Sequence, residues 1–287
     1  MNNNLPFSHK IPETENNALY MVGTPIGNLD DITFRALKVL KEVSFIACED
    51  TRQTKKIMNR YDMSNNLISF NKNNSFKKIP KIINALLSGK SVAIVSDAGM
   101  PSICDPGEDL VKKAKSLGIR VICIPGPSAV TTALASSGMC SSKFIFEGFL
   151  PKKKIEREKI LFEISSNEKT TVLFESPHRI KKLLQELNDF CGGQREIQIF
   201  RELTKKFEEH IGCNIKEAID FVKDKEILGE ITIVIKGIQK TKIFDYDLEL
   251  LKRELHELVN AGLTLSAASK YLAKKRNTTK SVIYKLY

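Results

Sequence analysis

The alternation of short apolar runs with segments of helical spacing is the feature that most constrains the fold of this chain. Runs rich in Val, Ile and Phe, separated by helical patterns, are typical of β-α units whose strands are buried on both faces of a parallel sheet. A first set comprises, in chain order, runs at 19–22, 45–48, 67–70, 92–95 and 121–124, with helical spacing at 31–43 and 78–87. A second set comprises runs at 144–146, 171–174 and 197–200, a short piece near Ile215, and 231–235. The sequence therefore predicts an α/β fold.

The length of the chain, 287 residues, favours more than one domain, because a single hydrophobic core stops growing near this size. The polar segment 1–17 lacks an apolar pattern and is expected to be a disordered leader. We expect an N-terminal α/β domain at 18–140, a second α/β domain at 141–240, and a small helical module at 241–287.

Helical periodicity and concentrated positive charge distinguish the C-terminal module. One helical face carries Leu248, Leu251, Leu255 and Leu258, and Gly262 is placed to end that helix. Two further short helices are predicted at 266–276 and 279–287. From Ala261 onward there are five Lys, one Arg and no acidic residue, within a chain whose net charge is +11. We expect contacts to the phosphates of a polyanion such as RNA, made by Lys274, Lys275 and Arg276; the alternative is a solvated basic tail.

Several classes of protein are excluded by the composition. No stretch approaches the roughly 18 apolar residues of a membrane span, and the N-terminal residues lack the apolar region of a signal peptide. The six cysteines are scattered without a C-x-x-C pair, and the four histidines do not lie near them in metal-ligand spacing. We therefore expect a cytoplasmic protein with reduced thiols, no membrane contact and no metal.

Three loops rich in Gly and Pro follow predicted strands, at 23–30, 96–107 and 125–129. In open parallel sheets, ligands bind beyond the carboxyl ends of the strands, and Gly and Pro present backbone groups rigidly at close range. None of the loops contains G-x-x-x-x-G-K-[ST] or G-x-G-x-x-G, so the usual phosphate cradles are missing. The sequence predicts a small-molecule site built from main chain, whose ligand need not bring phosphate. Taken singly, each loop is also explained as a tight turn.

Seven ordered motifs resemble those of the ribosomal RNA small subunit methyltransferase I family, within the tetrapyrrole methylase superfamily. They are GTPIGNLDDIT at 23–33, CEDTR at 48–52, SDAGMPSICDPG at 96–107, PGPSA at 125–129, FESPHR at 174–179, RELTKKFEE at 201–209 and GEITIVI at 229–235. The resemblance runs from about Leu19 to the C-terminus. It departs from the family at Met100 and Cys104, where the family has Thr and Ser.

The resemblance implies two α/β domains with a cofactor cleft between them, and S-adenosylmethionine as the cofactor. It also implies a homodimer that transfers a methyl group to the ribose 2′-oxygen of a cytidine in the 16S rRNA of the small ribosomal subunit. Two observations from the residues agree with this. A sulfonium cofactor suits Gly/Pro loops without a phosphate cradle, and a polyanionic substrate suits the net charge of +11.

The resemblance also implies roles for individual residues. The cofactor residues would be Pro25, Asp97, Ala98, Gly99, Ile103, Ser128 and Ala129 in the first domain, with Phe174, Leu203, Gly229, Glu230 and Ile231 in the second. An equal alternative for Glu230 is that it caps the turn before its strand. Cations suited to RNA phosphates are Arg52, Arg179, Lys205 and the run Lys152 to Lys154. An equal alternative for that lysine run is a solvated helix start.

Methyl transfer to a hydroxyl depends largely on positioning, with a base that assists the hydroxyl. Glu175 ranks first as that base, because it follows a strand whose end should face the cleft. The alternatives are Glu49, Asp50, His178 and Glu202.

Two other functions remain open at this point. A methylase of the same superfamily acting on a tetrapyrrole or another small molecule would keep the cofactor loops, but the basic tail and the SPHR and RELTK strings speak against it. A non-catalytic RNA-binding protein would keep the charge but would not need SDAGMP or PGPSA.

Overall fold

The computed structural model describes residues 14–238, 248–276 and 278–287. The chain divides into two compact units, Met1–Ala129 and Val130–Tyr287. This division falls before the domain boundary expected at 140, because most of helix α5 (Ala129–Ser136) belongs to the second unit. The C-terminal helical segment, expected to be separate, is part of the second unit.

The first unit is built on a five-stranded parallel sheet, as the sequence predicts. Its strands are β1 (Ala18–Val22), β2 (Phe45–Cys48), β3 (Leu67–Ser69), β4 (Val92–Val95) and β5 (Arg120–Ile124), in the spatial order β3-β2-β4-β1-β5. Its helices are η2 (Leu29–Asp31), α1 (Phe34–Glu42), α2 (Thr51–Arg60), α3 (Ser75–Leu87) and α4 (Glu108–Ser116). The helix predicted at 31–43 begins later, because the Thr33 hydroxyl caps α1 by accepting from the Ala36 amide.

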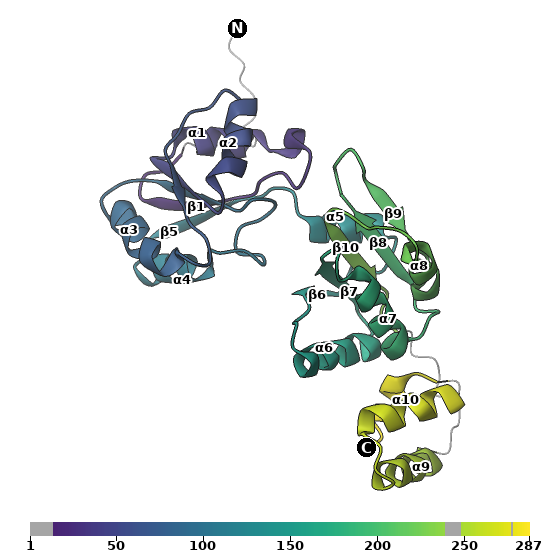
Figure 1. Ribbon diagram of the computed structural model, residues 1–287. Helices are drawn as coiled ribbons and strands as arrows, with labels where there is room; N and C mark the ends of the chain where they lie inside the picture. Colours follow the sequence, from purple (N-terminus) through teal and green to yellow (C-terminus); the bar gives the residue numbers. More distant parts are fainter. Residues whose placement is uncertain (1–13, 239–247, 277) are drawn as a thin grey trace. The chain divides into compact units, whose positions relative to one another are not determined.

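Helices cover both faces of this sheet, with α1 and α2 on one side and α3 and α4 on the other (Figure 1). Alternate residues of β1 point to the two helix layers on opposite faces of the sheet. Tyr20 and Val22 pack in the cluster with α1 and α2, whereas Leu19 and Met21 pack in the cluster with α3 and α4. Burial on both faces explains why the strands are apolar throughout rather than alternating.

The described end of the expected leader, residues 14–17, contacts the first unit. The Glu15 amide donates to the Tyr20 hydroxyl at 2.7 Å, and the Glu15 carboxylate pairs with Arg120. These contacts tie residues 14–17 to the first unit, and the rest of the expected leader, 1–13, lies outside the described residues.

The second unit contains a mixed sheet, which corrects the expectation of parallel strands. Its strands are β6 (Phe144–Phe149), β7 (Thr170–Glu175), β8 (Ile197–Arg201), β9 (Glu209–Ile211) and β10 (Ile231–Ile235), in the order β6-β7-β10-β8-β9. Only β6 and β7 pair in parallel, because β10 inserts antiparallel between β7 and β8. The strand expected near Ile215 is wrong: Ile215 begins α8 (Ile215–Val222), which the Asn214 side chain caps.

Helices α6 (Lys154–Ser166), α7 (Ile180–Cys191) and α8 share one apolar core with this sheet. Leu161 and Leu183 from the helices lie in the same cluster as Leu173 and Ile233 from the strands. This core fixes the strand ends at which the predicted residues of the second unit lie.

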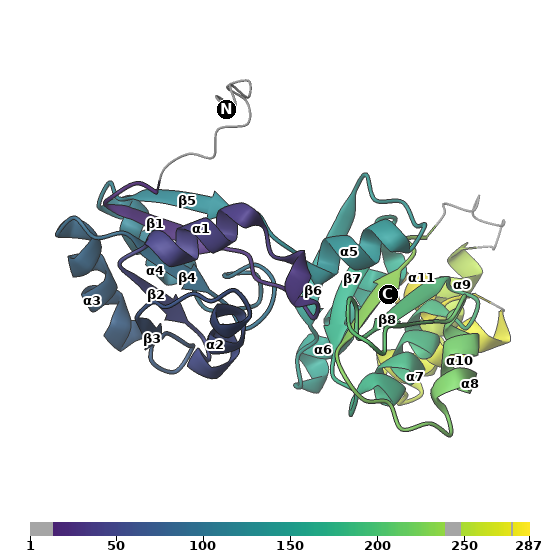
Figure 2. The same cartoon turned by 90° about the horizontal axis from the view of Figure 1, so that it is seen from above.

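Three helices form the C-terminal module, as the sequence predicts: α9 (Leu248–Asn260), α10 (Leu265–Lys275) and α11 (Lys280–Tyr284). Leu251 and Leu255 are buried in a small core with α10 and α11, while the side chain of Leu248 lies outside the described residues. Gly262 follows α9 with φ of 96°, a conformation that glycine adopts readily. The module contacts α6 and α7 (Figure 2). In that contact the rings of Phe162 and Tyr284 lie 5.1 Å apart.

Candidate functional site

The loops that follow β1, β4 and β5 meet at one edge of the first sheet, as the sequence predicts. Because β1 lies between β4 and β5 and all three run parallel, their carboxyl ends share this edge. The Thr24 amide donates to the Gly99 carbonyl at 2.9 Å, and the Gly99 amide donates back to the Thr24 carbonyl at 3.1 Å. The first two loops are therefore joined through their main chains.

The first and third loops touch where both residues are glycine. A Cβ added to Gly23 would lie 2.7 Å from the Gly126 Cα, and one added to Gly126 would lie 2.8 Å from the Gly23 Cα. Any side chain at either position would force the two backbones apart. The GTPIG and PGPSA motifs thus require glycine for close packing of these two loops.

The loop 96–107 carries unusual backbone conformations. Positive φ angles occur at Gly99 (75°), Ser102 (72°), Cys104 (67°) and Gly107 (147°). Residues other than glycine in this region cost about 1–3 kcal/mol each, and such strain gathers at ligand sites and switches. The strained residues fall in the loop that the sequence singled out.

The predicted cofactor residues of the first unit differ in exposure. The side chain of Asp97 is exposed, and Ile103 retains 49% of its surface. The others form the buried or half-buried framework behind them: Pro25, Ala98, Gly99, Ser128 and Ala129. In this unit, Asp97 and Ile103 are thus the predicted residues most accessible to a ligand.

Three carboxylates lie together at this edge. Burial raises the pKa of Glu49, and the neighbouring charges of Asp105 and Asp97 raise it further. Burial likewise raises the pKa of Asp105, with a further contribution from Asp97. The sequence analysis named Asp97 and Glu49 but missed Asp105. Its position before Pro106 and Gly107, at the end of the longest loop, was the available signal.

The predicted residues of the second unit gather at one end of its sheet. In the ladder, Ile231 faces Glu175 of β7 on one side and Arg201 of β8 on the other. Phe174 and the segments after β8 and before β10 are therefore neighbours. The Glu202 amide donates to the Glu230 carbonyl, and the Glu230 amide donates to the Glu202 carboxylate, both at 2.9 Å.

Lys205 neutralises two carboxylates at this end of the sheet. Its ammonium lies 2.8 Å from the Glu202 carboxylate and 3.1 Å from that of Glu230. Burial opposes the charges, but these hydrogen bonds outweigh it, raising the pKa of Lys205 and, with the Glu230 amide, lowering that of Glu202. Lys205, predicted to contact RNA, is therefore already paired with two carboxylates of its own unit. The lowered pKa of Glu202 makes it a weak base.

Glu175 lies in the interior, with its side chain fully buried. Its carboxylate accepts from Arg179 at 2.6 and 2.9 Å and from the Ser176 amide at 2.7 Å, and Arg157 lies 3.6 Å away. A buried carboxylate that already accepts two hydrogen bonds from a guanidinium and one from an amide is poorly placed to take a proton from a substrate. These contacts favour a structural part for Glu175, and its role as the base stays a prediction.

The same contacts affect Arg179, which was expected to contact RNA. Besides its two bonds to Glu175, Arg179 donates to the Leu150 carbonyl at 3.0 Å. Its guanidinium thus joins the start of α7 to the segment after β6. Its position is explained by packing of the second unit.

Arg52, another predicted RNA contact, is exposed, with 87% of its side chain accessible. It forms a two-pronged pair with Asp50, whose nearest approach is 2.6 Å. Hydrogen bonds from Arg52 lower the pKa of Asp50 to about 2, so Asp50 is a poor proton acceptor. The Asp50 amide donates to Asp97 at 2.9 Å, which ties the start of α2 to the strained loop.

The charges of the basic tail were expected to contact RNA, but several of them form ion pairs within the second unit. Arg276 pairs with Glu254 of α9, Lys275 lies 3.6 Å from the same carboxylate, and Lys270 pairs with Asp189 of α7 at 2.9 Å. Lys274 is exposed. Part of the tail's charge thus joins its helices to one another and to α7.

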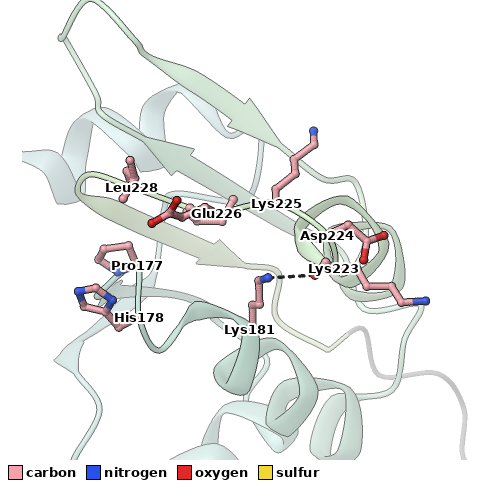
Figure 3. A pocket seen from close by; sticks show the side chains of 9 residues that line it. Pro177, His178, Lys181, Lys223, Asp224, Lys225, Glu226 and Leu228 are labelled. Carbon is pink, nitrogen blue, oxygen red and sulfur yellow. Dashed lines mark hydrogen bonds between the residues drawn. The ribbon is translucent and has the colours of Figure 1, made fainter.

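A surface pocket lies beside the predicted motif FESPHR, lined by Pro177, His178, Lys181 and the segment 223–228 (Figure 3). The Lys181 ammonium donates to the Lys223 carbonyl at 2.9 Å across it. His178, an alternative base, lies at its margin. Within residues 14–238, 248–276 and 278–287, no group of three His, Cys, Asp or Glu is arranged to hold a metal ion, and no helix is long and apolar enough to span a membrane.

Comparisons with known proteins point in one direction. The model of the tetrapyrrole (corrin/porphyrin) methylase family matches residues 18–219. The ribosomal RNA small subunit methyltransferase I of Bacillus subtilis is 40% identical over 273 residues, covering 94% of this chain and 93% of the relative. The protein of the same name from Thermotoga maritima is 49% identical over 219 residues, covering 76% of this chain and 98% of the relative.

Solved structures resemble the chain in fold. A cobalt precorrin-4 methyltransferase superposes with a TM-score of 0.60 at 18% identity, covering 77% of this chain and 95% of its own. A uroporphyrin-III C-methyltransferase from Thermus thermophilus superposes with a TM-score of 0.56 at 15% identity, covering 76% of this chain and 96% of its own. At these identities the likeness concerns architecture alone.

Proposed function

The chain belongs to the tetrapyrrole methylase family, and from this membership we propose that it is an S-adenosylmethionine-dependent methyltransferase of ribosomal RNA. The observation that carries the proposal is the match of 94% of the chain, at 40% identity, to relatives named ribosomal RNA small subunit methyltransferase I. The finer proposal is that the acceptor is the ribose 2′-oxygen of a cytidine in 16S rRNA, within the small ribosomal subunit in the cytoplasm. It rests on the seven motifs of the sequence.

The residues of the first unit fit a sulfonium cofactor. Backbone packing at Gly23 and Gly126 leaves main chain rather than side chains at the loop edge, and the carboxylates of Glu49, Asp97 and Asp105 favour a cation there. When bound, S-adenosylmethionine would supply a methyl group already activated by positive sulfur. We propose that it is held by Pro25, Asp97, Ala98, Gly99, Ile103, Ser128 and Ala129.

We further propose that residues of the second unit recognise the cofactor's adenosine. Phe174 offers an aromatic ring, packed 5.0 Å from Phe146 and 5.6 Å from Phe149, and Leu203 is an apolar, buried residue of the same unit. Hydrogen bonding between Glu202 and Glu230 fixes the segment of Gly229, Glu230 and Ile231. Because the Glu230 carboxylate is paired with Lys205, we propose that Glu230 holds this segment in position.

Glu49 is the base that the environment favours. A base that takes the proton of a ribose hydroxyl works best when its pKa approaches the working pH, and burial moves the pKa of Glu49 in that direction. Hydrogen bonds lower the pKa of Asp50 and Glu202 instead. We propose Glu49 in place of Glu175.

The remaining proposals concern partners. Arg52 and Lys274 are exposed cations suited to RNA phosphates. A homodimer is proposed from the resemblance, and light scattering at micromolar concentration tests it: twice the chain mass of 32.3 kDa supports it, and a monomer removes it.

The function is tested by calorimetric titration with S-adenosylmethionine, followed by labelled-methyl transfer. Small ribosomal subunits from a methylase-deficient strain and a tetrapyrrole, uroporphyrinogen III, are offered as acceptors in parallel. We expect binding that survives EDTA and label in the subunits alone. Label in the tetrapyrrole would move the chain to the small-molecule methylases, and no cofactor binding would make it a non-catalytic protein.

A further inference from the structure

A second pocket, of about 480 Å³, lies where the C-terminal module meets α6 and α7. Its cationic lining residues are Lys152, Lys154, Arg157, Lys182, Lys270 and Lys280. Its carboxylates are Glu158, Glu186 and Asp189, so the lining carries six positive and three negative side chains. None of these residues belongs to the cofactor loops of the first unit.

The three carboxylates do not balance the six cations evenly. Glu186 accepts from Arg157 at 2.7 Å and lies 3.8 Å from Lys182, and Asp189 pairs with Lys270 at 2.9 Å. Among the residues that the structure describes, Lys152, Lys154 and Lys280 have no carboxylate within ion-pair distance. The third carboxylate, Glu158, makes no ion pair among the described residues but acts on Lys280 through its charge, so the pocket keeps a net excess of positive charge.

Lys280 is the most unusual of them, because it is only 6% exposed. Its ammonium donates to the Ser266 hydroxyl at 2.9 Å and lies 4.1 Å from the centre of the Phe190 ring. Burial lowers its pKa, and the nearby charges of Glu158 and Asp189 offset that effect only in part. A buried ammonium without a direct ion pair is costly, and an anion that enters the pocket would relieve that cost.

Arg157 gives a second observation that points to a ligand. It is 6% exposed and lines the pocket, and its Nη2 has no hydrogen-bond partner in the described part of the chain; the nearest carboxylate, that of Glu175, lies 3.6 Å away. One donor of this buried guanidinium, in the lining of the same pocket, is thus left without a hydrogen bond. Two buried cations and two exposed lysines together form a built anion site.

We propose that this pocket binds a backbone phosphate of the RNA substrate, with Lys280 at its base and Lys152 and Lys154 at its rim. The assignment to RNA rests on the proposed function, because a ribosomal RNA substrate brings phosphates at every nucleotide. The pocket is lined by residues of the C-terminal module and of the α6–α7 region, so one phosphate bound there would hold the module against the RNA.

The test compares the parent protein with K280M, which keeps the length of the side chain against Phe190, and with K152Q/K154Q, whose residues are exposed. K159Q/K169Q is the matched control, because it removes two exposed charges of the same region that lie outside the pocket. Inorganic phosphate is the first probe, at constant ionic strength. We expect it to raise the melting temperature of the parent and the control more than that of K280M.

Small ribosomal subunits are the second probe, with affinity measured over a salt series. Each lost phosphate contact should reduce the slope of log affinity against log salt by about 0.7–0.9. We expect this reduction in K280M and in K152Q/K154Q, at unchanged affinity for S-adenosylmethionine, and a smaller one in the control.

The two probes separate the possible failures. If K280M and K152Q/K154Q both show the parent's rise in melting temperature with phosphate and the parent's salt slope, the proposed anion site is overturned. A lost phosphate response with a parent-like salt slope would mean that the pocket takes free phosphate and would overturn its assignment to RNA. If the parent protein binds S-adenosylmethionine but does not methylate subunits, the proposed function is wrong. That assay does not depend on the pocket, so the two failures can be distinguished.

Discussion

At the scale of single residues, the backbone contact between Gly23 and Gly126 constrains two of the cofactor loops. Gly126→Ala places a methyl group within 2.9 Å of the Gly23 backbone, so the loops must separate. We expect a loss of about 1–3 kcal/mol in stability, typical of overpacking, and a weaker affinity for S-adenosylmethionine. Thermal melting and calorimetry measure the two effects. If both stay at parent values, the close approach has no consequence for the site.

Asp105 makes a pH-dependent contribution of known sign. Its pKa in the folded protein is raised by burial and by Asp97, so the folded state favours its neutral form. The associated stability is present below the ordinary pKa of an aspartate and is lost as pH rises through the raised value. We therefore expect Asp105→Asn to raise the melting temperature at pH 7, with the difference from the parent shrinking as pH falls toward about 4. An equal or lower melting temperature at pH 7 would contradict the proximity of these carboxylates.

Replacing Glu by Gln should mainly lower stability at Glu175 and mainly lower the rate of methyl transfer at Glu49. Glu175→Gln leaves Arg157 and Arg179 without their shared charge, and breaking a buried pair costs about 3–5 kcal/mol. Glu49→Gln should keep the fold and lower the rate of methyl transfer by about 10²–10⁴-fold, the range of general-base catalysis. Melting curves and single-turnover transfer distinguish them. A stable, inactive Glu175→Gln protein would restore Glu175 as the base.

At the scale of elements, the basic tail divides into charges that fasten helices and charges that face solvent. Arg276 joins α10 to α9 through Glu254, whereas Lys274 and Lys285 are exposed. We expect Arg276→Gln to lower the melting temperature and increase hydrogen exchange in α10. Lys274→Gln with Lys285→Gln should leave both unchanged and weaken salt-dependent binding to small subunits. A tail unaffected by Arg276→Gln would show that the pair with Glu254 contributes little.

Strand positions were predictable from sequence, but strand directions in the second sheet were not. The runs at 171–174, 197–200 and 231–235 are apolar throughout, and such runs look alike whether their neighbours are parallel or antiparallel. Ile215 was misassigned because a buried helix start and a short strand share apolar residues. Its preceding Asn214, a helix cap, was the informative residue.

At the scale of the whole molecule, the sequence located the loop edge well and the charged network poorly. Gly and Pro mark the loops after β1, β4 and β5 directly, because their backbone properties are local. Glu175 and Lys205 each have one partner nearby in sequence, Arg179 and Glu202, but their second partners, Arg157 and Glu230, are distant in sequence, so the folded chain is needed to reveal them. Long-range ion pairs leave no local sequence signal.

The central claim is that this chain methylates a ribose in small-subunit rRNA, and mapping the product tests it most directly. Small subunits from a methylase-deficient strain are incubated with the protein and labelled S-adenosylmethionine, and the rRNA is digested to nucleosides for mass spectrometry. The account predicts one labelled nucleoside, 2′-O-methylcytidine, from a single site in 16S rRNA, with transfer reduced in Glu49→Gln. Label on a base, on a ribosomal protein or on no component of the subunit would contradict it.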